Sequence, residues 1–431
     1  MLFKIEYSVK NKPMISVPEA FSILEHNLPV LQELELSLLQ ARKHILAQSL
    51  MSPINMPPFR QSAMDGYALC LHDALVYEIA MTEAVANTNE DLAIPYSYKK
   101  QIVSTYEIVG EIKAGDSHTV ELLPGQSVKI FTGAAVPDSA QAVIQIEKVT
   151  ANGSQLLLDE LVEPETNVRP IGEQISAGDL ALQKGTLLNA AAIGFLAGLG
   201  FTKVSVYKKP KVGIVVTGNE LSKAGTPLEY GKVYESNGIM LQSALIDAFY
   251  DEVTIYEVND DFENTKNKLN EALNANDVVL VSGGISVGDY DFVARALKEL
   301  QVDTLFYKVN QKPGKPLFAG KLNNKMVFAL PGNPAACLTC FYVYVLPTLS
   351  ILSGAEANYQ QAVLFPLVHD YEVKNTRSQF LKASISNGKA EILTHQNSSM
   401  LNSFSVSNGL VYVSHGHYEL KKGDKVEVYL L

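Results

Sequence analysis

Ser282 to Asp291, with the sequence SGGISVGDYD, combine glycines and carboxylates directly after a predicted strand. Gly283 and Gly284 let the backbone approach a ligand, because no Cβ stands in the way. A helix is expected to begin near Asp289, and the free N–H groups and dipole of a helix N-terminus favour an anion. Two carboxylates there would repel an anion unless a divalent cation such as Mg²⁺ lies between them. The segment predicts a site for a phosphate-bearing ligand and a metal ion, although Asp289 is explained equally well as a helix N-cap.

Three further predicted strand ends carry residues of the same kind. The four strands predicted between Lys211 and Leu330 end in polar, turn-forming segments: TGNE (217–220), VNDD (258–261), SGGISVGDYD (282–291) and LPGNP (330–334). Turns alone account for the Gly, Asn and Pro residues. They do not account for Glu220 and Asp260 at the edge where ligands of open α/β sheets bind. We therefore expect a cleft along this edge.

The segment KPGKP (312–316), called the lysine loop below, is a candidate for phosphate binding. Two prolines and a glycine hold Lys312 and Lys315 in a stiff loop near the last predicted strand. A lysine ammonium binds phosphate as a point charge. A solvated turn is the alternative interpretation. The LPGNP segment, with two prolines around a Gly-Asn turn, either shapes a pocket or only ends its strand.

Hydrophobic periodicity and start and stop signals predict the elements that would position these residues. Strands and helices alternate from residue 211 onwards, which predicts a parallel, doubly wound α/β sheet. Strands are expected at 211–218, 252–258, 277–284 and 326–334. Helices are expected at 238–249, 262–273, 290–300 and 335–352.

The flanking regions have other patterns. Helices are predicted at 17–28, 31–46 and 188–199. Ser16 and Pro18 mark the start of the first helix. Between residues 52 and 185, short β-rich pieces separated by Gly, Pro, Asn and Asp predict an all-β module, in which 75–106 lacks clear periodicity. Four β-rich pieces after residue 355 predict a small terminal barrel or sheet.

The composition argues against several classes of protein. A formal net charge of -11 does not suit sequence-independent nucleic-acid binding, which depends on Lys and Arg. Three cysteines are too few for a disulfide framework and indicate a reducing compartment. We interpret Cys337 and Cys340 as apolar helix positions rather than a redox or metal motif. The N-terminus lacks the apolar stretch of a signal peptide, and the apolar segment 337–352 is shorter than the ~20 residues of a membrane span. We expect a cytoplasmic protein that binds neither nucleic acid nor a membrane.

Six motifs occur in an order and at spacings that match a known family. They are SAMDGYA (62–68), IFTGAAVP (130–137), VTGNEL (216–221), SGGISVGDYDF (282–292), KPGKPL (312–317) and LPGNPAA (330–336). Together they resemble the molybdopterin molybdenumtransferases, the MoeA family, to which the C-terminal domain of gephyrin is also similar. The resemblance extends from about residue 14 to residue 431.

The resemblance implies a reaction and a fold. Adenylylated molybdopterin is bound with a divalent cation, Mg²⁺; molybdate is inserted at the dithiolene, and AMP is released. The implied fold is multidomain α/β plus β, with a central doubly wound, MogA-like α/β domain. The implied regions are an elongated linking and dimerisation region (14–50 and 171–208), a β-rich domain that carries SAMDGYA (51–170), the α/β molybdopterin-binding domain (209–354) and a C-terminal β-barrel domain (355–431).

The resemblance also implies partners. It suggests a homodimer with a composite active site, in which SAMDGYA faces the α/β domain across the subunit interface. This arrangement would explain why Asp65 lies far from the other candidate residues in the sequence. A molybdopterin adenylyltransferase is a candidate protein partner.

The resemblance implies a role for each residue that stands at a matching position of a family motif. The implied catalytic residues are Asp65, Thr132, Glu220, Asp260 and Asp291. The candidate metal ligands are Glu220, Asp289 and Asp291. Substrate-binding roles fall on Gly283, Gly284, Ser286, Gly288, Lys308, Lys312, Lys315, Pro331, Pro334, Arg169 and Arg377.

The sequence departs from the family pattern in several places. Gln174 replaces the aspartate of the family's RRxGEDI segment, and a neutral amide neither supplies charge nor accepts a proton. Glu235 stands where the family has Asp, NSSML (397–401) contains less glycine, and 75–106 is longer. Two alternatives stay open. One is a non-catalytic relative that binds the cofactor or a protein; the other is the adenylyltransferase that makes the adenylylated pterin, whose fold resembles the α/β domain alone.

Overall fold

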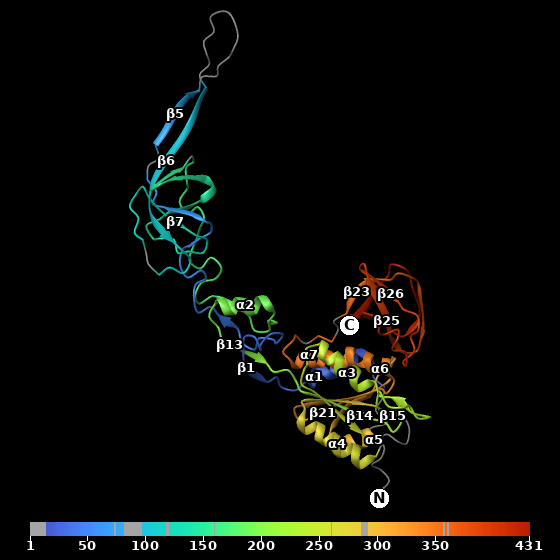
Figure 1. Cartoon of the computed structure of the whole chain (residues 1–431). Helices are drawn as coiled ribbons and strands as arrows, with labels where there is room; N and C mark the ends of the chain where they lie inside the picture. The colour runs from blue at the N-terminus through green and yellow to red at the C-terminus, as the bar shows by residue number, and fades with distance from the viewer. Residues whose placement is uncertain are drawn as a thin grey trace, which may run out of the picture. The chain divides into compact units, whose positions relative to one another are not determined.

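The structure is a computed structural model, and it describes residues 14–72, 75–81, 97–117, 120–158, 160–259, 261–285, 292–356, 358–359 and 362–431. The chain divides into two compact units (Figure 1). The first unit contains Met1–Gln48, Lys184–Ile193 and Lys203–Leu431. The second contains Ser49–Gln183 and Gly194–Thr202. The finer division into four regions stays a prediction.

A six-stranded sheet in the order β17-β14-β18-β22-β21-β19 forms the centre of the first unit. Its parallel strands are those predicted: β14 (Val212–Thr217), β17 (Val253–Val258), β18 (Val278–Ser282) and β22 (Lys325–Leu330). The four predicted strands are parallel, and two strands that were not predicted, β19 (Asp303–Lys308) and β21 (Pro316–Leu322), extend one edge of the sheet by antiparallel pairing. The turn between β21 and β22 explains the change of direction. Asn323 adopts the left-handed conformation there (φ 53°), which Asn tolerates better than most residues.

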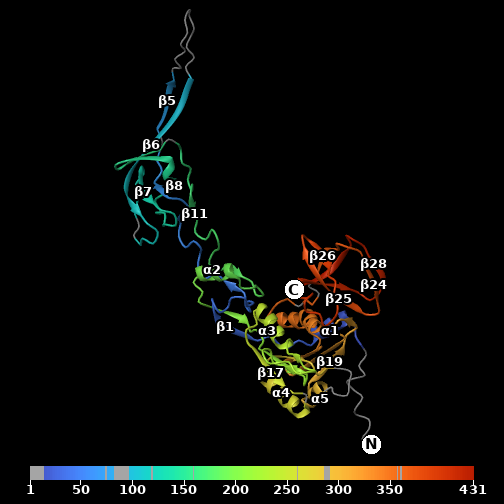
Figure 2. The same ribbon diagram turned by 45° about the vertical axis from the view of Figure 1, so that its right-hand side comes forward.

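Helices cover both faces of this sheet (Figures 1 and 2). One face carries α1 (Val17–His26), α3 (Asn237–Asp247), α6 (Pro334–Cys340) and α7 (Leu346–Leu352). The other carries α4 (Phe262–Ala275) and α5 (Phe292–Glu299). Along β14, Val212, Ile214 and Val216 pack in the core of the first face, whereas Val215 packs in the core of the second. Burial on both faces explains why these strands are continuously apolar.

The helix predicted at 31–46 is wrong. Residues Glu33–Ser37 form strand β1, which pairs antiparallel with β13 (Lys203–Tyr207), and turns follow it. The sequence ELELS alternates with a period of two, which favours a strand over a helix. Lys43 has a φ of 63°, which a right-handed helix cannot contain.

The helix from Pro334 to Leu352 is long and apolar enough to cross a membrane, but most of it is buried within the protein. It consists of α6, a π-helical turn (Phe341–Val345) and α7, and it contributes to the core on one face of the sheet. Cys337 and Cys340 are fully buried in it, and burial raises the pKa of the Cys337 thiol to about 12. Their burial supports the interpretation as packing residues, because a reactive cysteine requires an accessible thiolate.

The second unit is β-rich, as predicted. Its main sheet has the order β8-β4-β7-β6-β10-β9. The strands are β4 (Gly66–Leu69), β6 (Ser97–Ile112), β7 (Gln126–Ile130), β8 (Ala142–Gln145), β9 (Val149–Asn152) and β10 (Gln155–Leu158). The stretch 75–106, which could not be assigned from periodicity, contains β5 (Leu75–Met81) paired antiparallel with β6. Helix α2 (Ala190–Gly198) confirms the helix predicted at 188–199.

The C-terminal region of the first unit is also β-rich, as predicted. Its main sheet has the order β20-β25-β27-β29-β23, and β26 pairs with β25. The bounds are β23 (Val363–Pro366), β25 (Ser378–Ser386), β26 (Lys389–Ile392), β27 (Gly409–Val413) and β29 (Lys425–Leu430). The short strand β20 (Gln311–Lys312) belongs to the segment that leads into the lysine loop, and it pairs parallel with the start of β25. The lysine loop therefore joins this sheet as well as the central one.

Candidate functional site

Two glycines follow β18 at the carboxyl edge of the central sheet. Gly283 and Gly284 have φ of 92° and 64°, a conformation that L side chains rarely adopt. A Cβ on Gly283 would lie 2.3 Å from the carbonyl oxygen of Thr217, and one on Gly284 would lie 2.5 Å from Cγ2 of Val293. The glycines are therefore required by the packing of the turn itself, in addition to any close approach of a ligand.

Gly283→Ala is expected to lower the free energy of unfolding by about 2–3 kcal/mol, because a left-handed backbone and a clash with a strand carbonyl both oppose a Cβ. Equilibrium unfolding in denaturant measures the loss. Gly225→Ala is the matched control: Gly225 has a φ of 86°, but a Cβ there would have no other atom within 4 Å, so only about 1 kcal/mol should be lost. Equal losses in both variants would contradict the argument from packing.

Asn237 links three of the structural elements at this edge. It lies at the start of α3, and its Nδ2 donates hydrogen bonds to Ser282 Oγ and to the carbonyl oxygen of Gly332, both at 2.8 Å. Its Oδ1 is buried and has no hydrogen-bond partner in the described part of the chain. Asn237 was not predicted as a site residue. Its position two residues after Glu235, in the family's YDSN motif, was the available signal.

Glu235 explains one departure from the family pattern. Its Oε1 accepts a hydrogen bond of 2.7 Å from the N–H of Gly238 in the first turn of α3. A carboxylate at a helix N-terminus satisfies a free N–H group and opposes the helix dipole favourably. The longer Glu side chain therefore supplies a helix cap in this protein.

Glu220 lies after β14 with an exposed side chain. Its carboxylate folds back beside Gly218, and its carbonyl oxygen accepts a hydrogen bond of 2.8 Å from the N–H of Val233. The other acidic candidates, Asp260, Asp289 and Asp291, lie outside the described residues, as do Ser286 and Gly288. No group of three His, Cys, Asp or Glu side chains that could hold a metal ion occurs among the described residues. The metal site therefore stays a prediction, and the oxygen donor of Glu220 fits Mg²⁺.

The lysine loop lies at the same edge of the sheet. Strand β19 runs in the same direction as β22, because each of them pairs antiparallel with β21. The carboxyl end of β19 carries Lys308, which is half-buried, whereas Lys312 and Lys315 are exposed. None of the three ammonium groups forms an ion pair within the described residues. The loop therefore adds free positive charge to the edge where the glycine turn lies.

Buried groups hold the lysine loop from below. Gln311 is fully buried; its Nε2 donates to the carbonyl oxygen of Pro313 at 3.1 Å, and its Oε1 accepts a hydrogen bond from the hydroxyl of Tyr344. Gly314 has a φ of 85°, and a Cβ there would lie 2.4 Å from Cys340 Sγ of α6. These contacts anchor the backbone of the loop in the fold, and phosphate binding by its exposed lysines stays a prediction.

The remaining candidates of the first unit surround this loop. Arg377, just before β25, donates a hydrogen bond of 3.4 Å to the carbonyl oxygen of Gln311. Pro331 is buried after β22, and Pro334 begins α6. The structure thus brings Arg377 to the segment that leads into the lysine loop.

A buried lysine that the sequence analysis missed organises the adjacent segment. Lys382, on β25, is 4% exposed. Its ammonium donates hydrogen bonds of 2.6–3.3 Å to four oxygens of one loop: the carbonyls of His395, Asn397 and Met400, and Ser403 Oγ. The same loop contains Ser398, whose carbonyl oxygen accepts from the N–H of Ala336 and whose Oγ accepts from Asn333 Nδ2. Lys382 therefore positions the NSSML segment against the N-terminus of α6.

In the second unit, the structure joins two candidates that are 67 residues apart. Asp65 Oδ1 accepts hydrogen bonds from the N–H of Thr132 at 2.7 Å and from Thr132 Oγ1 at 2.8 Å. These bonds lower the pKa of the Asp65 carboxyl, with the main-chain bond as the larger cause. Asp65 is exposed, so this anion is oriented by Thr132 and remains available to a ligand.

Thr132→Val is expected to raise the pKa of Asp65 part of the way to its ordinary value. One of the two hydrogen bonds to the carboxylate is lost, while the main-chain bond stays. Because the folded-state pKa is depressed, any process that needs the Asp65 anion persists until the pH falls through that lowered pKa. In the Thr132→Val variant, the pH below which such a process fails should be higher than in the wild type. Carboxyl carbon NMR titration of Asp65 measures the shift, and an unchanged midpoint would contradict the role of the hydroxyl.

Arg169 and Gln174 lie in the same unit. Arg169, on β11 (Val168–Arg169), pairs opposite Gln61, whose Nε2 donates to the carbonyl oxygen of Gly133 at 3.0 Å. Arg169 is therefore held beside the strand that leads to Asp65. Gln174 donates its N–H to the carbonyl oxygen of Met56 at 2.9 Å, and its side chain is exposed. This position supports no structural role for the Gln174 side chain.

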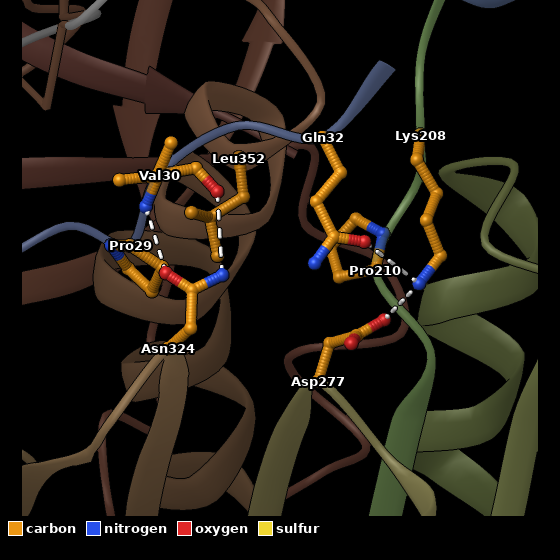
Figure 3. A pocket seen from close by; sticks show the side chains of 8 residues that line it. All are labelled: Pro29, Val30, Gln32, Lys208, Pro210, Asp277, Asn324 and Leu352. Carbon is orange, nitrogen blue, oxygen red and sulfur yellow. Dashed lines mark hydrogen bonds and ion pairs between the residues drawn. The ribbon is translucent and has the colours of Figure 1, made fainter. Parts of the chain in front are cut away.

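A small cavity of about 30 Å³ in the first unit contains none of the predicted site residues (Figure 3). It lies at the opposite, amino edge of the sheet, since Pro210 precedes β14 and Asp277 precedes β18. Lys208 Nζ binds Asp277 Oδ2 at 3.0 Å, and Asn324 exchanges two hydrogen bonds with the backbone of Val30 (Figure 3). Its polar groups bind one another, so we assign it a structural role.

Family models define the class of protein. Residues 15–200 match the MoeA N-terminal region (domain I and II), and residues 366–431 match the MoeA C-terminal region (domain IV). Between them, residues 213–350 match a family described as "probable molybdopterin binding domain". The fold and the matches together define a multidomain protein of the MoeA type, with the candidate site on its molybdopterin-binding domain.

The relatives identify the family. The chain is 30% identical over 428 residues to a molybdopterin molybdenumtransferase of Staphylococcus epidermidis, covering 98% of this chain and 97% of the relative. It is 34% identical to that of Haemophilus influenzae over 79% of this chain and 78% of the relative. A crystal structure of the molybdopterin biosynthesis MoeA protein of Pyrococcus horikoshii OT3 is 28% identical, with a TM-score of 0.76 and coverage of 97% and 100%. The chain belongs to the molybdopterin molybdenumtransferase family, and the predicted multidomain fold is confirmed.

Proposed function

We propose that this protein inserts molybdenum from molybdate into adenylylated molybdopterin and releases AMP, as a step of molybdenum cofactor biosynthesis. The observation that carries the proposal is that the Gly283–Gly284 turn and the lysine loop both lie at the carboxyl edge of one sheet. The turn exposes backbone without side chains, and the loop presents ammonium groups that are free of ion pairs in the described part of the chain. Phosphate and molybdate are both tetrahedral oxyanions that such groups bind.

The proposed roles divide between the two units. Glycines and lysines of the first unit, together with Ser286, Gly288, Pro331, Pro334 and Arg377, bind the phosphorylated pterin and molybdate. Glu220, Asp289 and Asp291 would hold Mg²⁺, which neutralises phosphate charge when it is bound, and Asp260 would act with them as a catalytic residue. Asp65, oriented by Thr132, supplies an anion beside the reacting groups, and Arg169 binds substrate in the same unit.

We further propose a cytoplasmic homodimer in which Asp65 of one subunit faces the lysine loop of the other. Membership of the family supports this arrangement, and so does the exposed, oriented Asp65 anion in a separate compact unit. A molybdopterin adenylyltransferase is the proposed protein partner, because it would deliver the adenylylated substrate directly.

The deciding experiment measures AMP release from adenylylated molybdopterin with molybdate, with tungstate and with neither anion. We expect release that depends on molybdate. Folded protein that binds the pterin without release would instead favour a non-catalytic binding relative, and recovery of release in Gln174→Asp would assign the defect to that residue. ATP-dependent adenylylation of molybdopterin would favour the adenylyltransferase alternative, against which the matches outside the α/β domain already argue.

Chelation of divalent cations is expected to abolish molybdate-dependent AMP release without unfolding the protein, because the carboxylates then repel the substrate phosphates. Addition of Mg²⁺ in excess of the chelator should restore the rate. Asp291→Asn should require a higher Mg²⁺ concentration for half-maximal rate. A rate that is insensitive to the chelator would refute the metal site, while leaving the transfer reaction itself intact.

A further inference from the structure

We infer that the first unit has a second anion site, for a small phosphate monoester, in a hollow of about 280 Å³ lined by Arg42, Lys43, His44 and Lys209. The hollow lies near the amino ends of β14 and β17, because Lys209 precedes the first strand and Phe249 to Glu252 precede the second. The glycine turn and the lysine loop lie at the opposite, carboxyl edge of the same sheet. The inference is therefore independent of the proposed function.

The backbone around the hollow is held in an unusual conformation. Lys43 and Phe249 both have a φ of 63°, which side-chain-bearing residues other than Asn, Asp and His seldom adopt. Lys43 is fixed there by a hydrogen bond of 2.8 Å from its N–H to the carbonyl oxygen of Leu188. The two residues meet in the hollow, with Lys43 Nζ 4.9 Å from the centre of the Phe249 ring. Strained residues that converge on one place are typical of functional sites.

The charges of the hollow are not balanced. Arg42, Lys43 and Lys209 form no ion pair with a carboxylate among the residues that the structure describes. Lys209 Nζ donates one hydrogen bond of 2.7 Å, to the carbonyl oxygen of Phe249. Glu252 is already bound to Lys211 at 2.7 Å, which leaves Asp251 as the free carboxylate of the lining.

The positive charges of this cluster act on one another. Burial lowers the pKa of Lys209, and the nearby charges of Arg42 and Lys43 lower it further, against an opposing effect of Asp251. Burial and the Lys209 charge likewise lower the pKa of His44. An anion in the hollow would relieve this repulsion. In a chain with a net charge of -11, an unbalanced cationic cluster is a local feature and not a reflection of composition.

The lining selects the class of ligand. An arginine fork and lysine point charges suit a phosphate group. The floor adds apolar surface: Tyr250 is buried with its hydroxyl 3.0 Å from Ser353 Oγ, and Phe249 is 41% exposed. The volume is at the lower limit of ligand pockets. A small monoester, with a phosphate and a short apolar remainder, fits these features better than inorganic phosphate or a nucleic acid.

The absence of tryptophan from the chain allows a direct test. Leu39 lines the hollow and is 79% exposed, so Leu39→Trp places a single reporter at its mouth. Fluorescence is followed during titration with glycerol 3-phosphate, with inorganic phosphate and, at matched ionic strength, with chloride. We expect saturation with both phosphates, tighter for the monoester, and none with chloride. In the same background, Arg42→Gln with Lys43→Gln should weaken binding at least about tenfold.

The matched control replaces two exposed lysines outside the hollow, Lys298→Gln with Lys389→Gln, and should leave the affinity unchanged. Circular dichroism verifies the fold of each variant. The inference is overturned if no titration saturates, if chloride gives the same response, or if both double variants bind alike. It is also overturned if the Arg42 and Lys43 substitutions change the mass in light scattering but not phosphate affinity, because the cluster would then bind a second copy of the chain.

Discussion

Lys382→Met is expected to lower the free energy of unfolding by about 3–5 kcal/mol, because it removes the donor shared by a buried network. Burial of the Lys382 charge is unfavourable and lowers the pKa of Lys382 in the folded protein. Methionine avoids this cost. It nevertheless leaves three main-chain carbonyls and Ser403 Oγ without their ammonium donor. Most of the loss should therefore come from the orphaned acceptors of the loop.

Denaturant unfolding of Lys382→Met beside Lys389→Met measures this effect. Lys389 is exposed on β26, the neighbouring strand, so its replacement should change stability by less than about 0.5 kcal/mol. Similar losses in the two variants would show that the network around Lys382 is not stabilising. We also expect Lys382→Met to raise KM for the pterin substrate, since the loop that carries Ser398 would no longer be held at the N-terminus of α6.

Asp65→Asn is expected to reduce kcat/KM for molybdate-dependent AMP release by roughly 10²–10⁴-fold, the range typical of a charged group that acts on reacting atoms. The amide keeps the size of the side chain and can still accept hydrogen bonds from Thr132, so stability should be nearly unchanged. Asp138→Asn is the control, because Asp138 is an exposed carboxylate of the same unit without an ion pair among the described residues. A loss of less than about threefold would remove Asp65 from the proposed site.

Mixing two inactive variants tests whether the site is shared between subunits. Asp65→Asn and Lys312→Gln with Lys315→Gln damage opposite sides of the proposed composite site. In a mixed dimer of these variants, one site would carry all the substitutions and the other would be intact, so equilibrated mixtures should recover about a quarter of the wild-type rate. If each subunit forms its own site, mixing should restore no activity. That result would refute the shared site but not the proposed transfer reaction.

The sequence predicted the parts of the fold that follow from local patterns. Continuous apolar strands such as Val212–Thr217 and the helices between them were recovered, because burial on both faces leaves a clear signal. Strands β19 and β21 were not predicted, because attention to the lysine loop between them left residues 303–322 without an assigned strand. Strand β1 was taken for part of a helix, although the alternation of Glu33, Glu35 and Ser37 was the better signal.

The candidate site was only partly predictable for a different reason. Motifs pointed to Asp65 and Thr132 separately, and only the pairing of β4 with β7 explains why they share hydrogen bonds. Lys382 belongs to none of the motifs, and Asn237 was not singled out although it stands in the YDSN motif; the importance of both comes from partners that are far away in the sequence. Such residues are recognised by the hydrogen-bond partners of buried polar groups in the structure. Sequence patterns do not record these partners.

Strand β20 has a consequence for how this protein can be divided. Along the chain, its two residues lie between β19 and β21 of the central sheet, and they pair with β25 of the C-terminal sheet. An isolated α/β fragment that ended near residue 354 would lose Tyr359, Phe380 and Phe404 from the core on one face of the sheet, and β20 would lose its pairing with β25. The lysine loop would then lose a contact that fixes its backbone, so we expect that replacing the C-terminal region with another module changes the positions of Lys312 and Lys315.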